Sequence, residues 1–150
     1  KEQPILAAHF SPLVSTESNV KVMVSHRSRK SPTVKDSRWV EERQELEENK
    51  PPEINEVLLV HEDQVYEGMS SNFLAVKNVN QKPVLICAGL EHVLLGTILK
   101  IVMTICEKEN IDIIWDFPRL KEANEWEGCF ITSTSRLILP VETIYNGSER

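Results

Sequence analysis

The sequence predicts an α+β domain in which a mixed β-sheet carries a few flanking helices. Short segments of alternating or β-branched residues recur along the chain, and four of them follow one another between residues 56 and 88. Segments with the composition and length of regular helices stand apart from them, at 36–49 and 90–110. The length of 150 residues fits one domain, which is large enough to bury a hydrophobic core.

The N-terminal part predicts a connector, a strand and a loop. Residues 1–19 have no hydrophobic period and contain two prolines and a Ser/Thr/Asn cluster, so we interpret them as a connector that enters the domain. The chain starts at Lys1 within this segment, which suggests a piece of a longer protein. VKVMVS (20–25) alternates and predicts a strand, whereas the basic run HRSRKSP (26–32) is typical of a solvated loop.

The middle of the chain predicts one helix followed by a meander. Residues 36–49 consist largely of helix-forming residues and precede Pro51-Pro52, so we expect a single helix with an amphipathic face. That face would contain Trp39, Val40, Arg43 and Leu46. Four strands are expected next, at 56–61, 64–68, 72–77 and 83–88.

The C-terminal part predicts a long helix and three further strands. Within 90–110 a helix should begin near Gly96 and bury a face made of residues 94, 98, 101, 102 and 105. A strand at 111–117 and a short helix at 120–128, ended by Gly128, should follow. Strands at 129–133 and 136–141 would close the sheet around the bend at 134–135.

Composition argues against several classes of protein. The chain has 17 Lys and Arg against 23 Asp and Glu, a net charge of −6, which disfavours a general nucleic-acid or anionic-membrane role. Cys87, Cys106 and Cys129 are widely spaced in apolar runs, so we expect buried free thiols in a reducing compartment and no metal site. No membrane span or signal peptide is apparent. We therefore expect a soluble, cytoplasmic protein; an organellar location stays open, since any transit peptide would precede Lys1.

Three bends carry more hydrogen-bonding groups than a turn requires: EGMSSN (67–72), GTI (96–98) at a helix start, and TSTS (132–135) between two strands. Exposed N–H groups at a helix N-terminus attract phosphate, and neighbouring hydroxyls add donors. Two of these bends together would form a phosphate cradle, although Ser and Thr are also ordinary turn residues. The lone carboxylate of Glu67 is also more than a plain hairpin needs.

Taken together, Glu-Gly-x-Ser-Ser-Asn-Phe, Leu-x-Gly at a helix start, and Phe-x-Thr-x-Thr before Pro-Val resemble the class IV family of pyridoxal-phosphate enzymes. That family holds the branched-chain and D-amino-acid aminotransferases and aminodeoxychorismate lyase. The match covers about residues 20–145, and it resembles the family's larger, C-terminal domain. It implies a mixed sheet curled into a pseudo-barrel, a pyridoxal 5'-phosphate site on residues 20–150, and a homodimer.

The resemblance also implies a role for individual residues. Lys35 lies 67 − 35 = 32 residues before Glu67, where the family has the lysine that forms a Schiff base with the cofactor. Glu67 would keep the pyridine nitrogen protonated. The remaining cofactor contacts would come from the three bends and the residues beside them: Ser70, Ser71, Asn72, Leu94, Gly96, Thr97, Ile98, Ser133, Thr134 and Ser135. An ordinary surface lysine before a helix is the alternative interpretation of Lys35.

The family's N-terminal domain, which supplies an arginine to the cofactor phosphate and much of the substrate pocket, is absent from these residues. Arg27, Arg29 or Arg38 could take over the phosphate contact, since all three lie near Lys35.

The implied function is amino-group transfer between two small molecules, an amino acid and a 2-oxo acid, of the branched-chain or D-amino-acid kind. Lys35 would move the α-proton of the substrate. A lyase that uses the same residues on an aminated chorismate is one alternative, and a non-catalytic binding or structural relative is another. The presence of Lys35, Glu67 and Thr134 favours an enzyme, although the isolated chain could be inactive.

Overall fold

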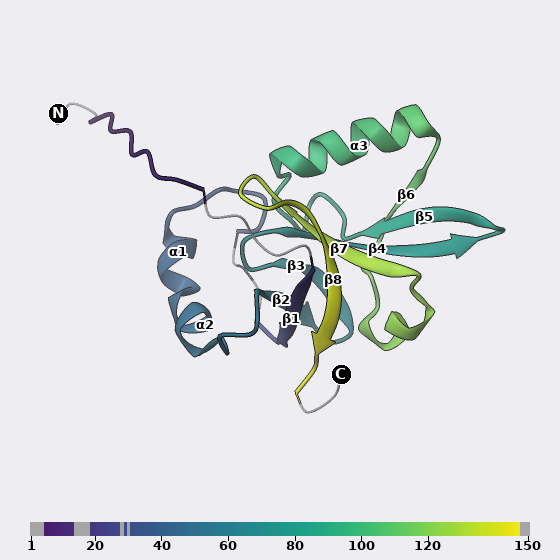
Figure 1. Ribbon diagram of the computed structural model, residues 1–150, viewed down its shortest axis with the longest axis horizontal. Coiled ribbons are helices and arrows are strands. Elements are labelled where there is room, and N and C mark those ends of the chain that lie inside the picture. The colour runs from purple at the N-terminus through teal and green to yellow at the C-terminus, as the bar shows by residue number, and fades with distance from the viewer. Residues whose placement is uncertain (1–4, 14–18, 28, 30, 148–150) are drawn as a thin grey trace.

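The computed structural model describes residues 5–13, 19–27, 29 and 31–147 (Figure 1). Its strands are β1 (Val20–Ser25), β2 (Glu56–His61), β3 (Gln64–Gly68), β4 (Asn72–Val79), β5 (Lys82–Cys87), β6 (Asp112–Trp115), β7 (Gly128–Ser133) and β8 (Leu137–Tyr145). Its helices are α1 (Arg38–Glu42), α2 (Gln44–Asn49), α3 (Thr97–Glu109) and the 3-10 helix η1 (Leu120–Glu125). Within the described ranges the predicted order of strands and helices is confirmed, except that α1 and α2 stand where one helix was expected.

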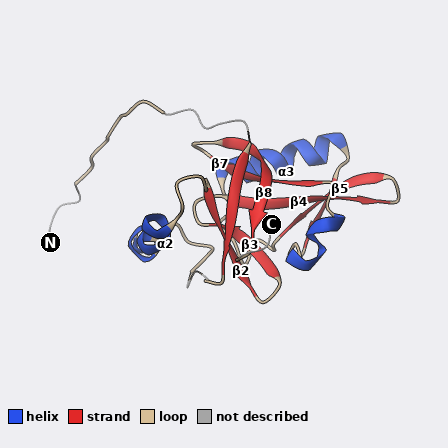
Figure 2. Ribbon diagram, turned by 60° about the horizontal axis from the view of Figure 1, so that its bottom comes forward, coloured by secondary structure: helices blue, strands red, loops and turns tan. Residues whose placement is uncertain are grey.

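The eight strands form one mixed sheet in the order β3-β2-β1-β8-β7-β4-β5-β6 (Figure 2). β1 runs parallel to both of its neighbours, β2 and β8, and β6 runs parallel to β5, while the other neighbours are antiparallel. The alternation seen in the sequence of β1 corresponds to buried Val20, Val22 and Val24. The first strand of the chain thus lies inside the sheet and joins its two parts.

The sheet curls on itself, which confirms the predicted pseudo-barrel. Val65 of β3 and Phe73 of β4 belong to one buried cluster, although their strands lie far apart in the sheet order. The same cluster includes Val22, Leu58 and Ile131, so the concave side of the sheet is filled with apolar side chains. Burial of such side chains is the main source of stability for a domain of this size.

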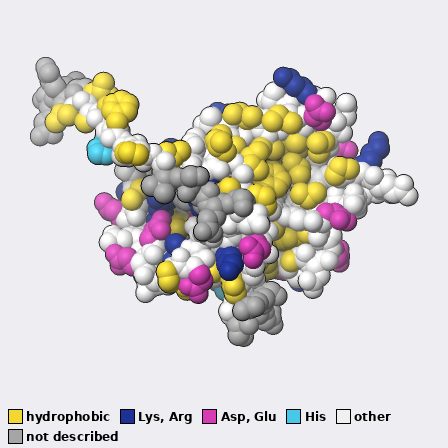
Figure 3. All heavy atoms as spheres, in the orientation of Figure 1, with side chains coloured by type: hydrophobic (Ala, Val, Ile, Leu, Met, Phe, Trp, Pro, Cys, Tyr) yellow, Lys and Arg dark blue, Asp and Glu magenta, His cyan; other side chains and the backbone are white. Residues whose placement is uncertain are grey.

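Helix α3 packs on the sheet through a different stripe from the one predicted. Leu99, Val102 and Cys106 are buried against a cluster from β4 and β5, whereas Ile101 and Ile105 are about half exposed. Of the predicted stripe Val102 is buried, but the prediction chose the wrong side of it. The apolar face of α3 is wide and runs from Ile101 and Ile105 to Leu99 and Cys106, so the pattern does not select the part that meets the sheet. Figure 3 shows apolar side chains gathered on this part of the surface.

Two further helix predictions need correction. The single helix expected at 36–49 is divided into α1 and α2 at Arg43, and neither helix buries a residue. The few apolar side chains of residues 36–49 do not form a stripe long enough to pack on the sheet. The second concerns Gly128, which begins β7 opposite Val76 and does not cap η1. That helix ends at Glu125, with Trp126 as its C-cap.

The predicted strands agree with the structure more closely than the predicted helices do. β8 is longer than expected because it continues past β7 to pair with β1, where Lys21 lies opposite Thr143. Cys87 and Cys106 are buried and Cys129 is partly buried, all as free thiols, in agreement with the prediction.

Residues 5–13 of the predicted connector have no regular structure and are exposed. Residues 1–4 and 14–18 of that connector, and Ser28 and Lys30 of the basic loop, lie outside the described residues. Among the helices that the structure does describe, none has the length and apolarity required to cross a membrane.

Candidate functional site

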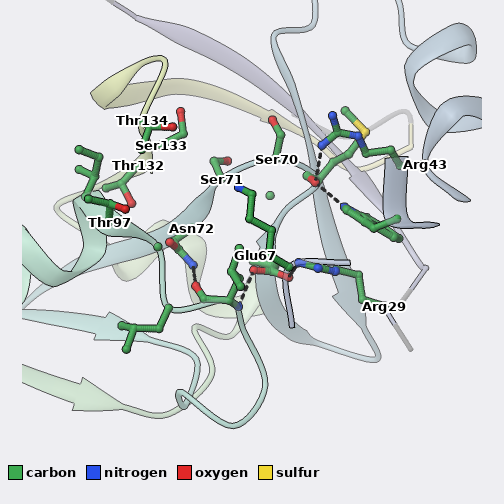
Figure 4. A pocket seen from close by; sticks show the side chains of 18 of the residues that line it. Arg29, Arg43, Glu67, Ser70, Ser71, Asn72, Thr97, Thr132, Ser133 and Thr134 are labelled. Atoms are coloured by element: carbon green, nitrogen blue, oxygen red, sulfur yellow. Dashed lines mark hydrogen bonds and ion pairs between the residues drawn. The ribbon is translucent and has the colours of Figure 1, made fainter. Parts of the chain in front are cut away.

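A cavity of about 550 Å³ brings together the three bends singled out in the sequence (Figure 4). Every predicted site residue except Ser135 lines it. The cavity is bounded by the end of β3, by the N-terminus of α3, by the bend between β7 and β8, and by the segment that runs into α1. Lys35 contributes from that last segment and has an exposed side chain.

Glu67 is buried at the end of β3, with 3% of its surface exposed. Its Oε1 accepts a hydrogen bond from Nη1 of Arg29 at 3.0 Å, and its Oε2 accepts one from the N–H of Leu94 at 3.1 Å. Burial raises the pKa of Glu67 to about 7, although the Leu94 N–H and the Arg29 guanidinium act to lower it. The carboxyl group is therefore fixed in place and can exchange a proton near neutral pH.

The turn after Glu67 is held against the start of α3. The N–H of Gly68 donates to the carbonyl of Ser71 at 2.8 Å, and Nδ2 of Asn72 donates to the carbonyl of Leu94 at 2.7 Å. A Cβ atom on Gly96 would lie 2.6 Å from Oδ1 of Asn72, so only glycine allows this close approach. Asn72 thus holds this turn against the start of α3 at the cavity.

The opposite end of the cavity offers donors to an anion. Helix α3 begins after Gly96 with no side-chain cap, so its first N–H groups carry the positive end of the helix dipole. Oγ1 of Thr132 is buried and finds no hydrogen-bond partner among the described residues. Figure 4 shows Thr97, Thr132 and Thr134 grouped at this end. Phosphate groups commonly bind where such donors converge.

Sequence reasoning missed a buried ion pair behind the cavity. The fully buried carboxylate of Glu56 accepts hydrogen bonds from the hydroxyls of Ser70 at 2.8 Å and Ser71 at 2.9 Å, and from the guanidinium of Arg136. Arg136 also donates to the carbonyl of Asn55 at 3.3 Å. The pair ties the start of β2, the serine turn and the β7–β8 bend together. Two features of the sequence could have indicated this pair: Glu56 stands at the start of an apolar strand, and Arg136 directly follows TSTS (132–135).

The three arginines proposed for the phosphate contact are each engaged by a carboxylate. Arg29 pairs with Glu67 as described above. The other two pairs are Arg27 with Glu45 at 2.6 Å and Arg38 with Asp36 at 2.6 Å.

Two residues of α1 and its C-terminal end also reach the cavity without having been predicted as site residues. Nε1 of Trp39 donates to the carbonyl of Met69 at 2.8 Å, and Nη1 of Arg43 donates to the same oxygen at 3.3 Å. The sequence had placed both only on the amphipathic face of the expected helix.

Comparison with protein families gives one match that spans most of the chain. The model of the family described as amino-transferase class IV matches residues 3–144. No curated protein sequence matches significantly.

Solved structures share the fold. A putative branched-chain amino acid aminotransferase from Thermotoga maritima matches with a TM-score of 0.70 and 24% identity over 93% of this chain and 53% of its own. A PLP-bound hypothetical aminotransferase from Mycobacterium tuberculosis gives 0.73 and 17%, over 89% and 49%. A putative 4-amino-4-deoxychorismate lyase from Legionella pneumophila gives 0.70 and 15%, over 87% and 50%. The chain spans about half the length of these proteins.

Proposed function

The chain belongs to the class IV aminotransferase family, and we propose that it is the cofactor-binding domain of an enzyme that transfers amino groups between amino acids and 2-oxo acids. One observation carries the proposal. A single cavity is lined by Lys35, by the buried carboxyl group of Glu67 and by the uncapped N-terminus of α3. An amine, a carboxyl group and an anion site are the three groups that pyridoxal phosphate requires.

The residues present fit this cofactor. The orphaned Thr132 hydroxyl and the first N–H groups of α3 would hold the phosphate, together with Thr134. Glu67 would face the pyridine nitrogen, and Lys35 would hold the cofactor covalently. When bound, the cofactor supplies an acceptor for the electrons left on the substrate α-carbon after deprotonation.

The chain's own groups then divide the work of proton transfer. The amine of Lys35 would take the proton from the α-carbon of the substrate and return one on the acceptor side. Glu67 would keep a proton on the ring nitrogen, and its burial supports this role because a pKa near 7 lets it share that proton at physiological pH. Arg29 and the Leu94 N–H would hold the carboxyl group in position.

Residues 20–150 would form this cofactor domain, and residues 1–19 would connect it to a further domain that completes the substrate pocket. The half-exposed Ile101 and Ile105 on α3 favour an association with a second polypeptide surface, for which a homodimer is our proposal.

A lyase is the second candidate function, because the similar structures include a 4-amino-4-deoxychorismate lyase from Pseudomonas aeruginosa and a putative one from Legionella pneumophila. The same residues would act in both reactions. A binding or structural relative without activity is the remaining alternative, and the test below separates it from both enzymes.

The proposal is tested by trapping the cofactor. The chain is mixed with pyridoxal phosphate, its visible absorbance is recorded, and borohydride is added before peptide mass mapping. We expect a visible band and a phosphopyridoxyl group on Lys35, both lost in Lys35→Ala and retained in Lys82→Ala, which alters an exposed lysine of β5. No band in the unaltered chain, or a label that persists in Lys35→Ala, would contradict the proposal.

A further inference from the structure

The charges that line the cavity are unevenly compensated. The lining residues that carry charge are Arg29, Lys35, Asp36, Arg43 and Glu67. Arg29 is paired with Glu67, and the carboxylate of Asp36 is paired with Arg38 outside the cavity. Lys35 is the proposed attachment point of the cofactor. Arg43 is thus left, among the described residues, as a cavity cation without a role.

The contacts of Arg43 leave most of its hydrogen-bonding capacity free. Its Nη1 donates to the carbonyl of Met69 at 3.3 Å, which is slightly longer than a normal N–H···O hydrogen bond. Its Nε lies 3.9 Å from a carboxylate oxygen of Glu47, whose side chain is 44% exposed, so that pair is weak. A guanidinium has five N–H donors, and within the described part of the chain these two contacts are all that is seen.

The location of Arg43 suits a second anion. Figure 4 shows Arg43 on one side of the cavity, beyond Ser70, and Thr97 and Thr134 on the other side, with Glu67 between them. A phosphate bound at the threonine end would therefore leave the Arg43 end free. Arg43 and Trp39 donate to the same carbonyl oxygen, that of Met69, so the guanidinium is anchored beside the turn that follows Glu67.

We propose that Arg43 binds the carboxylate of the amino-acid and 2-oxo-acid substrates, an inference that rests on the proposed function. Both substrates keep this carboxylate throughout amino-group transfer, and a cavity that accepts them needs a cation for it. The planar fork of an arginine matches the two oxygens of a carboxylate, and a charge-assisted pair of this kind can replace the long bond to the Met69 carbonyl. Arg43 therefore selects carboxylate-bearing substrates over simple amines and ketones.

The test measures binding of a charged probe and of its neutral counterpart. The chain with its cofactor attached is titrated with 4-methyl-2-oxopentanoate and with the methyl ester of that acid, and the change in visible absorbance gives each Kd. The variants are Arg43→Gln, Arg43→Lys and, as the matched control, Arg27→Gln. Arg27 has a side chain that is 47% exposed and pairs with Glu45, and neither residue lines the cavity. Borohydride labelling of Lys35 in every variant shows whether the cofactor remains attached.

Arg43→Gln should weaken binding of the acid by about 10- to 100-fold and leave that of the ester unchanged, since a hydrogen bond between charged groups is lost. Arg43→Lys should recover part of the loss, and Arg27→Gln should bind the acid normally. Normal labelling of Lys35 with unchanged acid affinity in Arg43→Gln would overturn this inference alone, as would an unaltered chain that binds acid and ester equally. Absence of labelling in the unaltered chain would overturn the proposed function, and this inference with it.

Discussion

Replacing Glu67 with Gln should remove a pH dependence from the stability of the chain. The buried carboxyl group has a pKa of about 7, against an ordinary value of 4.5. Between these two pH values the folded state keeps a proton that the unfolded chain releases, so the free energy of unfolding falls as pH rises through this window. The contribution is fully present below the unfolded pKa and is lost above about pH 7. At 1.36 kcal/mol for each pKa unit, the loss amounts to about 3 kcal/mol.

The assay is urea unfolding of the cofactor-free chain at several pH values from about 4 to about 8, because bound cofactor would fix the protonation of Glu67. In the unaltered chain the free energy of unfolding should fall as pH rises across this range. In Glu67→Gln that fall should be smaller by about 3 kcal/mol. Glu107→Gln, which alters an exposed glutamate of α3, should behave like the unaltered chain. Parallel pH profiles for Glu67→Gln and the unaltered chain would refute the argument that burial holds a proton on Glu67.

Three further predictions follow from the geometry around the cavity. Arg136→Met leaves the buried Glu56 carboxylate without its cation and should lower the free energy of unfolding by about 3–5 kcal/mol. The double variant Arg136→Met/Glu56→Gln should lose less, because no buried charge is left unpaired. Equal losses in the single and double variants would contradict this. Gly96→Ala should cost about 1–3 kcal/mol, because its methyl group would lie 2.6 Å from an asparagine oxygen, whereas Gly128→Ala meets nothing within 4 Å and serves as the control in thermal melts. Thr132→Val removes a buried hydroxyl that has no partner among the described residues, so it should stabilise the cofactor-free chain by about 1 kcal/mol. The same change should weaken pyridoxal phosphate binding several-fold in absorbance titrations. Unchanged cofactor affinity would show that the hydroxyl has no part in the site.

The sequence predicted the fold where local pattern and burial agree. Val20, Val22 and Val24 alternate in the sequence and alternate in burial, so the first strand was predicted with its correct bounds. Where the apolar face of a helix is wide, as in α3, the same reasoning chose the wrong part of that face, because the pattern does not say which part meets the sheet. The helix broken at Arg43 was also missed, since helix propensity says little when no face is buried.

For the candidate site, too, local sequence patterns predicted some features and not others. The three bends could be grouped before the structure was known because each combines small hydroxyl side chains with a helix start or a strand end. Their contacts could not be predicted, because a partner distant in sequence is decided by the tertiary fold. The hydroxyls of Ser70 and Ser71 donate to Glu56, and Glu67 pairs with Arg29. In neither case does the sequence around the carboxylate indicate which residue will be its partner. Arg43 was predicted as part of a helix face and lies instead at the cavity.

The position of β1 inside the sheet decides when this domain can fold. Among the described strands β1 is the first in sequence, yet it pairs on one side with β8, the last of them, where Val20 lies opposite Val141. Contacts between residues so far apart in sequence close a long loop, which slows folding. A ribosome-bound chain that lacks its last strand would present one edge of β1 unpaired, a state prone to aggregation. The cavity forms equally late, since Asn72 pairs with Thr132 across β4 and β7, so the proposed cofactor site is complete only after β7 has emerged from the ribosome.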